Sequence, residues 1–175
     1  ATLVVNYVAN SGLIGQTQKE ISDRYRNFIT PEPFTFSIWG VIYLLVAIAL
    51  IYQLYVWYKK NEYDPAMDKF NILFILTSIC NILWNIFWVM DNMVLSSVFI
   101  FVFAILLAMM NTHFKGLSFS GMQKIYPIAF SIYAGWLTVA TVTNIAALLV
   151  KSNWAMFGLP ESTITIITYL VVAAL

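Results

Sequence analysis

The sequence predicts an all-α integral membrane protein, a bundle of about five transmembrane helices with almost no soluble part. Of the 175 residues, 61% are hydrophobic and only 10% are charged, and the mean hydropathy is +0.81. About a quarter of the residues in a soluble domain are charged, so this chain has too few polar side chains to cover a surface facing water. Its apolar segments also lack the two-residue alternation of lipid-facing strands, which indicates helices.

Short polar stretches separate the apolar segments and hold nearly all of the charge. The first full segment, residues 36–58, contains no charged residue. At about 1.5 Å per residue it can cross the roughly 30 Å hydrocarbon layer. Three further transmembrane helices are predicted over residues 70–90, 94–110 and 126–150.

Both ends of the chain are apolar. We expect residues 1–9 to form the end of a truncated helix and residues 163–175 to start a further, truncated helix. Residues 1–9 lack the basic start and the small-residue cleavage site of a signal peptide. The chain is therefore predicted to be a single transmembrane helical domain from a longer protein.

The longest connection, residues 10–35, is predicted to form a loop that covers one end of the bundle. It carries charges of both signs, and Pro31 and Pro33 stiffen its approach to the first full helix. The Lys and Arg residues divide into four on this side of the membrane and five on the other. That division is too even to predict the orientation of the chain.

Polar and aromatic residues at bilayer depth form stripes along single helical faces. Asn81, Trp84 and Trp88 share one face of the second full helix, because they follow the i, i+3, i+7 spacing. An amide in hydrocarbon costs free energy unless it finds a partner, so such faces should point into the bundle. With matching stripes in the first and fourth full helices, the candidate ligand-binding residues are Trp39, Tyr43, Asn81, Trp84, Trp88, Trp136, Ala140 and Asn144.

Two interpretations of these stripes stay open. In the first, asparagines hydrogen-bond across helices and tryptophans fill the core or lie at the membrane interface. In the second, flat aromatic walls and a few amides form a cavity for an apolar, partly polar ligand. Small residues such as Ala134 and Gly135 would leave room for that ligand.

Signatures of catalysis are missing. The chain has one histidine and one cysteine, and no acidic residue lies inside a full helix, so no metal cluster, acid–base pair or nucleophile triad is predicted. The sequence therefore predicts a protein that is not an enzyme and requires no metal or cofactor. The net charge of +1 argues against a nucleic-acid partner, because few phosphates could be neutralised.

Three motifs resemble one family when they are taken together. Trp39-Gly-Val-Ile-Tyr43 is similar to the Trp-x-x-x-Tyr of the TspO/MBR family, the tryptophan-rich sensory proteins related to the mitochondrial translocator protein. Asn81-Ile-Leu-Trp84 resembles the Asn-x-x-Trp of its third helix. Trp136, Ala140 and Asn144 have the spacing of its fifth helix, and the match covers roughly residues 31–150.

The resemblance implies a five-helix fold, often dimeric, whose cavity binds tetrapyrroles, sterol-like lipids and synthetic apolar ligands. Transport, sensing and porphyrin breakdown have each been proposed for the family. A further helix after Asn144 lies beyond the usual five, which indicates a divergent, longer branch.

The predicted function is that of a membrane receptor or carrier for a flat apolar ligand, a tetrapyrrole or a sterol-like molecule. The alternative is a non-catalytic structural subunit of a larger membrane complex. The expected partners are membrane lipids and either a second copy of the chain or that larger complex. A bacterial and an organellar membrane fit the sequence equally well.

Overall fold

The computed structural model describes residues 2–13, 15–27, 29–60 and 67–153, and six residues nearer the C-terminus, namely 160, 162, 163, 165, 166 and 170. All regular secondary structure in these residues is helical, so the predicted all-α class is confirmed. By length and composition, four helical stretches are able to cross a membrane, namely Pro33–Lys59, Asp68–Val89, Met93–Lys115 and Gly121–Lys151.

The first full helix changes type at both ends. A 3-10 turn, η1 (Pro33–Ser37), leads into α3 (Ile38–Tyr55), and a π-helical turn, η2 (Val56–Lys60), continues it. Proline is suited to the first turn of a helix because the N–H it lacks would have no helical partner there. The sequence predicts one helix over residues 36–58, and hydrophobicity alone does not reveal these changes in hydrogen bonding.

The other long helices are α4 (Asp68–Val89), α5 (Met93–Lys115) and α6 (Ile125–Lys151). Helix α5 continues five residues beyond the predicted end at residue 110. In its polar last turns, Asn111 and Thr112 donate hydrogen bonds to carbonyl oxygens one turn earlier. Asn111 also donates to the Phe130 carbonyl oxygen of α6, which ties the two helices together.

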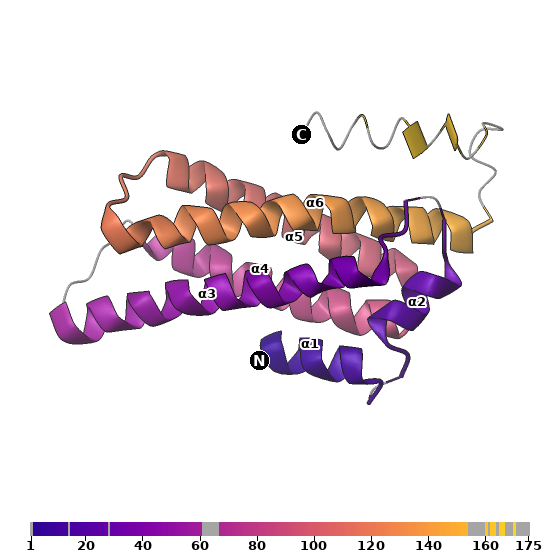
Figure 1. The fold of residues 1–175 in the computed structure, drawn as a ribbon, viewed down its shortest axis with the longest axis horizontal. Helices are drawn as coiled ribbons and strands as arrows, with labels where there is room; N and C mark the ends of the chain where they lie inside the picture. The colour runs from indigo at the N-terminus through magenta and orange to yellow at the C-terminus, as the bar shows by residue number, and fades with distance from the viewer. Residues whose placement is uncertain are drawn as a thin grey trace.

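The helices pack as a series of neighbouring pairs. Helix α4 packs on α5, α5 on α6, and α6 on α3, while the short α1 (Thr2–Ser11) lies along α4 (Figure 1). Side chains from these faces form the main core, which includes the fully buried Ile42, Phe70, Phe103, Phe130 and Leu137. Large apolar side chains such as Leu44, Ile72 and Phe101 remain exposed on the outer surface. Such a surface suits contact with lipid.

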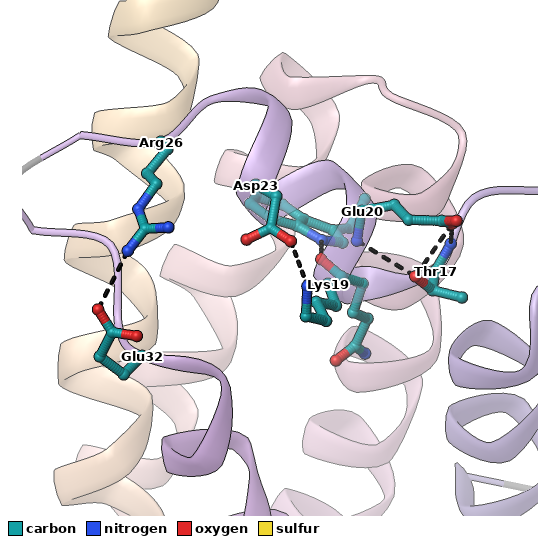
Figure 2. A network of polar contacts seen from close by, with 8 residues as sticks. Thr17, Lys19, Glu20, Asp23, Arg26 and Glu32 are labelled. Atoms are coloured by element: carbon teal, nitrogen blue, oxygen red, sulfur yellow. Dashed lines mark hydrogen bonds and ion pairs between the residues drawn. The ribbon is translucent and has the colours of Figure 1, made fainter.

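A short helix, α2 (Gln18–Arg24), lies within the connection for which the sequence predicts a loop. It begins with a capping box, in which Thr17 Oγ1 accepts from the Glu20 N–H and the Glu20 carboxylate accepts from the Thr17 N–H (Figure 2). Helix α2 rests on α1 and α4, and Ile21 is fully buried against Trp88 and Val89. Figure 1 shows α2 at one end of the bundle. We call α2 together with residues 25–27 and 29–32 the lid, and this end of the bundle the lid end.

The C-terminal helix predicted over residues 163–175 lies largely outside the described residues. Helix α6 ends at Lys151, one residue after the predicted boundary, and Asn153 has a left-handed backbone with φ of 51°. The site discussed below is built from the lid and from α3, α4 and α6.

Candidate functional site

Six of the eight predicted site residues line one interior cavity. The cavity measures only about 30 Å³ and lies between the lid and the helices α3, α4 and α6. Gln18, Ser22 and Pro31 of the lid also line it. The predicted residues that meet there are Trp39, Trp84, Trp88, Trp136, Ala140 and Asn144.

Trp39 is the centre of the aromatic cluster. Its ring lies 5.8 Å from Trp84 in a tilted arrangement and 6.2 Å from Trp136 edge to face. It also stacks on Tyr43 at 5.5 Å and meets Tyr133 edge to face at 5.8 Å. Offset and edge-to-face pairs are the favoured geometries of aromatic rings, so the cluster is well packed.

Buried donors around this cavity have no partner in the described part of the chain. They are the indole Nε1–H groups of Trp84 and Trp136 and the amide Nδ2 of Asn144. The Asn144 Oδ1, by contrast, accepts a 2.9 Å hydrogen bond from the Ser96 hydroxyl of α5. A buried donor without a partner costs about 1–3 kcal/mol. Because all three groups are donors, the cavity favours a hydrogen-bond acceptor.

Asn81 does not line the cavity and instead joins three helices. Its Nδ2 donates to the Tyr133 hydroxyl of α6 at 3.0 Å, and its Oδ1 accepts from Asn6 Nδ2 of α1 at 2.7 Å. Asn85 donates to Asn6 Oδ1 at 3.2 Å and accepts a hydrogen bond from Gln18 of the lid. The predicted interior positions of Asn81 and Asn144 are confirmed by exposed fractions of 0% and 1%.

Tyr43 also lies apart from the cavity. It lines a groove of about 390 Å³ to which Leu3, Val46 and Phe74 also contribute. Its hydroxyl is buried and has no hydrogen-bond partner in the described residues. Tyr43 therefore contributes to the site only through its stacking on Trp39.

Asp91, in the turn between α4 and α5, holds the lid in place. Its carboxylate accepts from Tyr25 at 2.9 Å and forms ion pairs with Arg24 at 3.2 Å and Lys151 at 2.9 Å. Trp88 Nε1 donates to the Gln18 carbonyl oxygen at 3.2 Å, a second contact between the bundle and the lid. We call the group of Asp91, Arg24, Tyr25 and Lys151 the latch.

The latch shifts the ionisation of Asp91. Partial burial acts to raise the pKa of Asp91, but hydrogen bonds from Lys151 and Tyr25 and the charges of Lys151 and Arg24 outweigh it, so the pKa lies below the usual value. Sequence reasoning missed the latch because these residues come from three separate segments. The only local signal was an aspartate in a turn between two apolar helices.

Neither histidine–cysteine chemistry nor a metal cluster is associated with this site. No group of three His, Cys, Asp or Glu side chains in the described residues could hold a metal ion. The single cysteine, Cys80, is a buried free thiol on α4. What the site offers to a ligand is aromatic surface, small side chains and N–H donors.

These features define a class, that of helical membrane proteins whose spans surround a tryptophan-rich interior beneath an N-terminal lid. A family model described as TSPO-like protein matches residues 1–175. The chain therefore belongs to the TSPO-like family, and the resemblance drawn from the three motifs is confirmed. Searches of curated proteins and of solved structures each gave no match.

Proposed function

We propose that this protein is a membrane receptor or carrier that binds a flat, largely apolar ligand at the tryptophan cluster beneath the lid. The observation that carries the proposal is the set of unpartnered donors from Trp84, Trp136 and Asn144 around one aromatic cavity. A tetrapyrrole or a sterol-like molecule has a broad apolar surface for the rings and a carboxylate, carbonyl or hydroxyl oxygen for the donors.

Binding of such a ligand requires the site to open. Pockets for small molecules measure about 300–1,000 Å³, whereas this cavity measures about 30 Å³. The lid is the element best suited to move, because α2 is a short helix of seven residues that is held by the partly exposed latch, by Ile21 and by the contacts of Gln18 with α4. Access to the site is therefore proposed to depend on displacement of α2.

The proposal assigns binding and no catalysis to the site. Indole and amide N–H groups do not exchange protons with a substrate near neutral pH. They can orient an acceptor on a ligand, and they can discriminate against a ligand that lacks one. The membrane to which the chain belongs is left open by this proposal.

The alternative proposal, a structural subunit of a larger membrane complex, is favoured by the tight interior. The rings around Trp39 leave little space, and the Asn6–Asn81–Asn85 network consists of contacts between helices. In that case the exposed apolar surface would contact partner helices as well as lipid.

Protoporphyrin IX binding to the full chain in detergent, followed by quenching of tryptophan fluorescence, distinguishes the two. Trp136→Phe keeps a ring but removes the donor, and should weaken binding about two- to tenfold. Trp136→Ala should weaken it about tenfold or more. The matched control is Tyr58→Phe, which also keeps a ring and removes a donor, because Tyr58 is 78% exposed and does not line the cavity.

Unchanged affinity in both Trp136 variants, with their helical content intact, would remove Trp136 from the site. If the native chain binds neither protoporphyrin IX nor cholesterol in lipid nanodiscs, the structural role is favoured instead.

A further inference from the structure

A large cavity of the described residues lies at the end of the bundle opposite the lid. It measures about 610 Å³, about twenty times the volume of the cavity beneath the lid. The end of α3, the turn η2, the start of α4 and the connection between α5 and α6 surround it. Figure 1 shows these segments together at the end of the bundle away from α2. We call this cavity the opposite-end pocket.

Aromatic side chains form much of its wall. Tyr126 lies 6.2 Å from Tyr52 and 6.2 Å from Phe119, measured between ring centroids. Trp57 projects from the π-helical turn and is 62% exposed at the rim. Short π-helical turns are rare and occur often at functional sites. The wall therefore provides an apolar surface for part of a ligand.

The polar groups of the pocket favour an acceptor. Gln53 Nε2 donates to Asn71 Oδ1 at 2.8 Å, which joins α3 to α4 across the pocket. Gln123 Oε1 accepts from the Ser120 N–H at 3.1 Å. The amide NH2 groups of Asn71 and Gln123 make no hydrogen bond within the described part of the chain, and no carboxylate is among its described lining residues.

The charge around the pocket is positive. Lys115 lies two residues before Leu117 of the lining and itself lines a neighbouring groove between α5 and α6. Lys124 follows Gln123 directly, so both lysines lie beside the pocket and outside its described lining. Both lysines are exposed, as are Lys59 and Lys69 at the same end. Along the sequence, the connections at this end carry five lysines and three acidic residues, whereas those at the lid end carry four basic and five acidic residues. The excess of positive charge is therefore confined to this end.

We propose that the opposite-end pocket binds an anionic glycerophospholipid from the surrounding bilayer. The pocket lies where four membrane-spanning stretches begin or end, which is the level of lipid headgroups. The phosphate lies toward the amide donors of Asn71 and Gln123, in the positive field of the nearby Lys115 and Lys124, while the upper acyl chains contact Tyr52, Phe119 and Tyr126. This site is separate from the tryptophan cluster, so the proposal does not depend on the function proposed above.

Native mass spectrometry of the delipidated full chain in detergent tests the proposal. The first molecule of palmitoyl-oleoyl phosphatidylglycerol should bind several-fold more tightly than phosphatidylcholine with the same chains. Each lysine near an anionic headgroup contributes about fivefold to binding. The double variant Lys115→Gln, Lys124→Gln should therefore remove the preference for phosphatidylglycerol. The control Lys19→Gln, Arg26→Gln removes two positive charges from the lid end and should keep that preference.

A second variant tests the pocket itself. Ser118 is exposed and lines the pocket, so Ser118→Trp should fill it and weaken the first binding step about tenfold. Ser152→Trp, at an exposed position of the lid end, is the matched control. An excess of sn-glycerol 3-phosphate should not compete, because the acyl chains supply part of the affinity.

Several results would overturn the proposal. The native chain could bind the two lipids equally well. The lid-end charge control could lose the preference for phosphatidylglycerol as fully as the Lys115→Gln, Lys124→Gln variant does. Ser118→Trp could bind the lipid as the native chain does, with its helical content intact. Full competition by glycerol phosphate would indicate a site for a soluble phosphate in place of a lipid.

Discussion

At the scale of single residues, two buried asparagines have different degrees of hydrogen bonding. Asn81 connects α4 to α1 and α6 through Asn6 and Tyr133. Asn144 connects α6 only to Ser96 of α5, and its Nδ2 has no partner in the described residues. Both occupy interior stripes that the sequence predicts, yet Asn81 joins three helices while Asn144 retains a donor without a partner in the described residues.

This difference predicts unequal losses of stability. Asn81→Leu breaks the buried hydrogen bonds of Asn81 with Asn6 and Tyr133 and should reduce the free energy of unfolding by about 1–3 kcal/mol. Asn144→Leu breaks one hydrogen bond and removes an unpartnered donor, so it should reduce the free energy of unfolding by less. We expect roughly 0.6 kcal/mol, the average contribution of a hydrogen bond between membrane helices. Unfolding by sodium dodecyl sulfate, followed by circular dichroism, measures both. Equal losses, or the reverse order, would contradict the assignment.

At the scale of elements, the lid is a local structure held by distant contacts. Its helix α2 begins with the capping box of Thr17 and Glu20, while Lys19 pairs with Asp23 and Arg26 with Glu32 inside the lid (Figure 2). These exposed pairs contribute little to stability. The latch at Asp91 decides where the lid lies, because it gathers contacts from the lid and from the end of α6.

Removal of the latch charge should therefore loosen the lid and leave the bundle unchanged. Asp91→Asn loses both ion pairs, and we expect faster hydrogen exchange at neutral pH in the amides of α2 but not in those of α5. Glu32→Gln breaks only the exposed pair with Arg26 and is the matched control. Faster exchange in the amides of both α2 and α5, in both variants, would indicate general destabilisation and would count against a latch.

The lowered pKa of Asp91 predicts a dependence on pH. The pKa of Asp91 is lower when the lid is closed than when it is open. Ionised Asp91 therefore stabilises the closed lid at any pH above the ordinary pKa of 3.8. This stabilisation is lost as the pH falls through the lowered pKa of the closed state. A spin label at Lys19→Cys, in a Cys80→Ala background, should become more mobile at acidic pH. The same label in Asp91→Asn should show no such transition. A transition that persists in Asp91→Asn would assign the pH response to another group.

At the scale of the whole molecule, the exposed apolar surface has a direct consequence for mutations. Ile105 lies near the middle of α5 and is 46% exposed. An arginine at the centre of a membrane helix costs about 2.5–3.5 kcal/mol on insertion scales. Ile105→Arg should therefore reduce membrane insertion, as measured by glycosylation mapping. Met122→Arg, at an exposed position near the end of a span, should insert normally. Equal insertion would contradict the lipid-facing assignment of Ile105.

The site was predictable in part, because helical periodicity shows which residues share a face of one helix. Helical periodicity places Trp84 and Trp88 on one face, so their meeting with Trp39, Trp136, Ala140 and Asn144 follows once the faces turn inward. Periodicity does not give the depth at which helices pack, so Tyr43 and Asn81 belong to neighbouring contacts. It also does not give the volume enclosed, which depends on how closely the rings of Trp39 and its neighbours approach.

The membrane class, the family and the approximate ends of the four long helices were all predictable from the amino-acid sequence. These properties depend on hydrophobicity and spacing within single segments, which are local in the chain. Only the tertiary structure decided which groups have partners, because Asn6 meets Asn81 across 75 residues and Arg24 meets Asp91 across 67. The tight tryptophan cluster, the latch and the opposite-end pocket all arise from such distant contacts, and local patterns carry no information about the distances between helices.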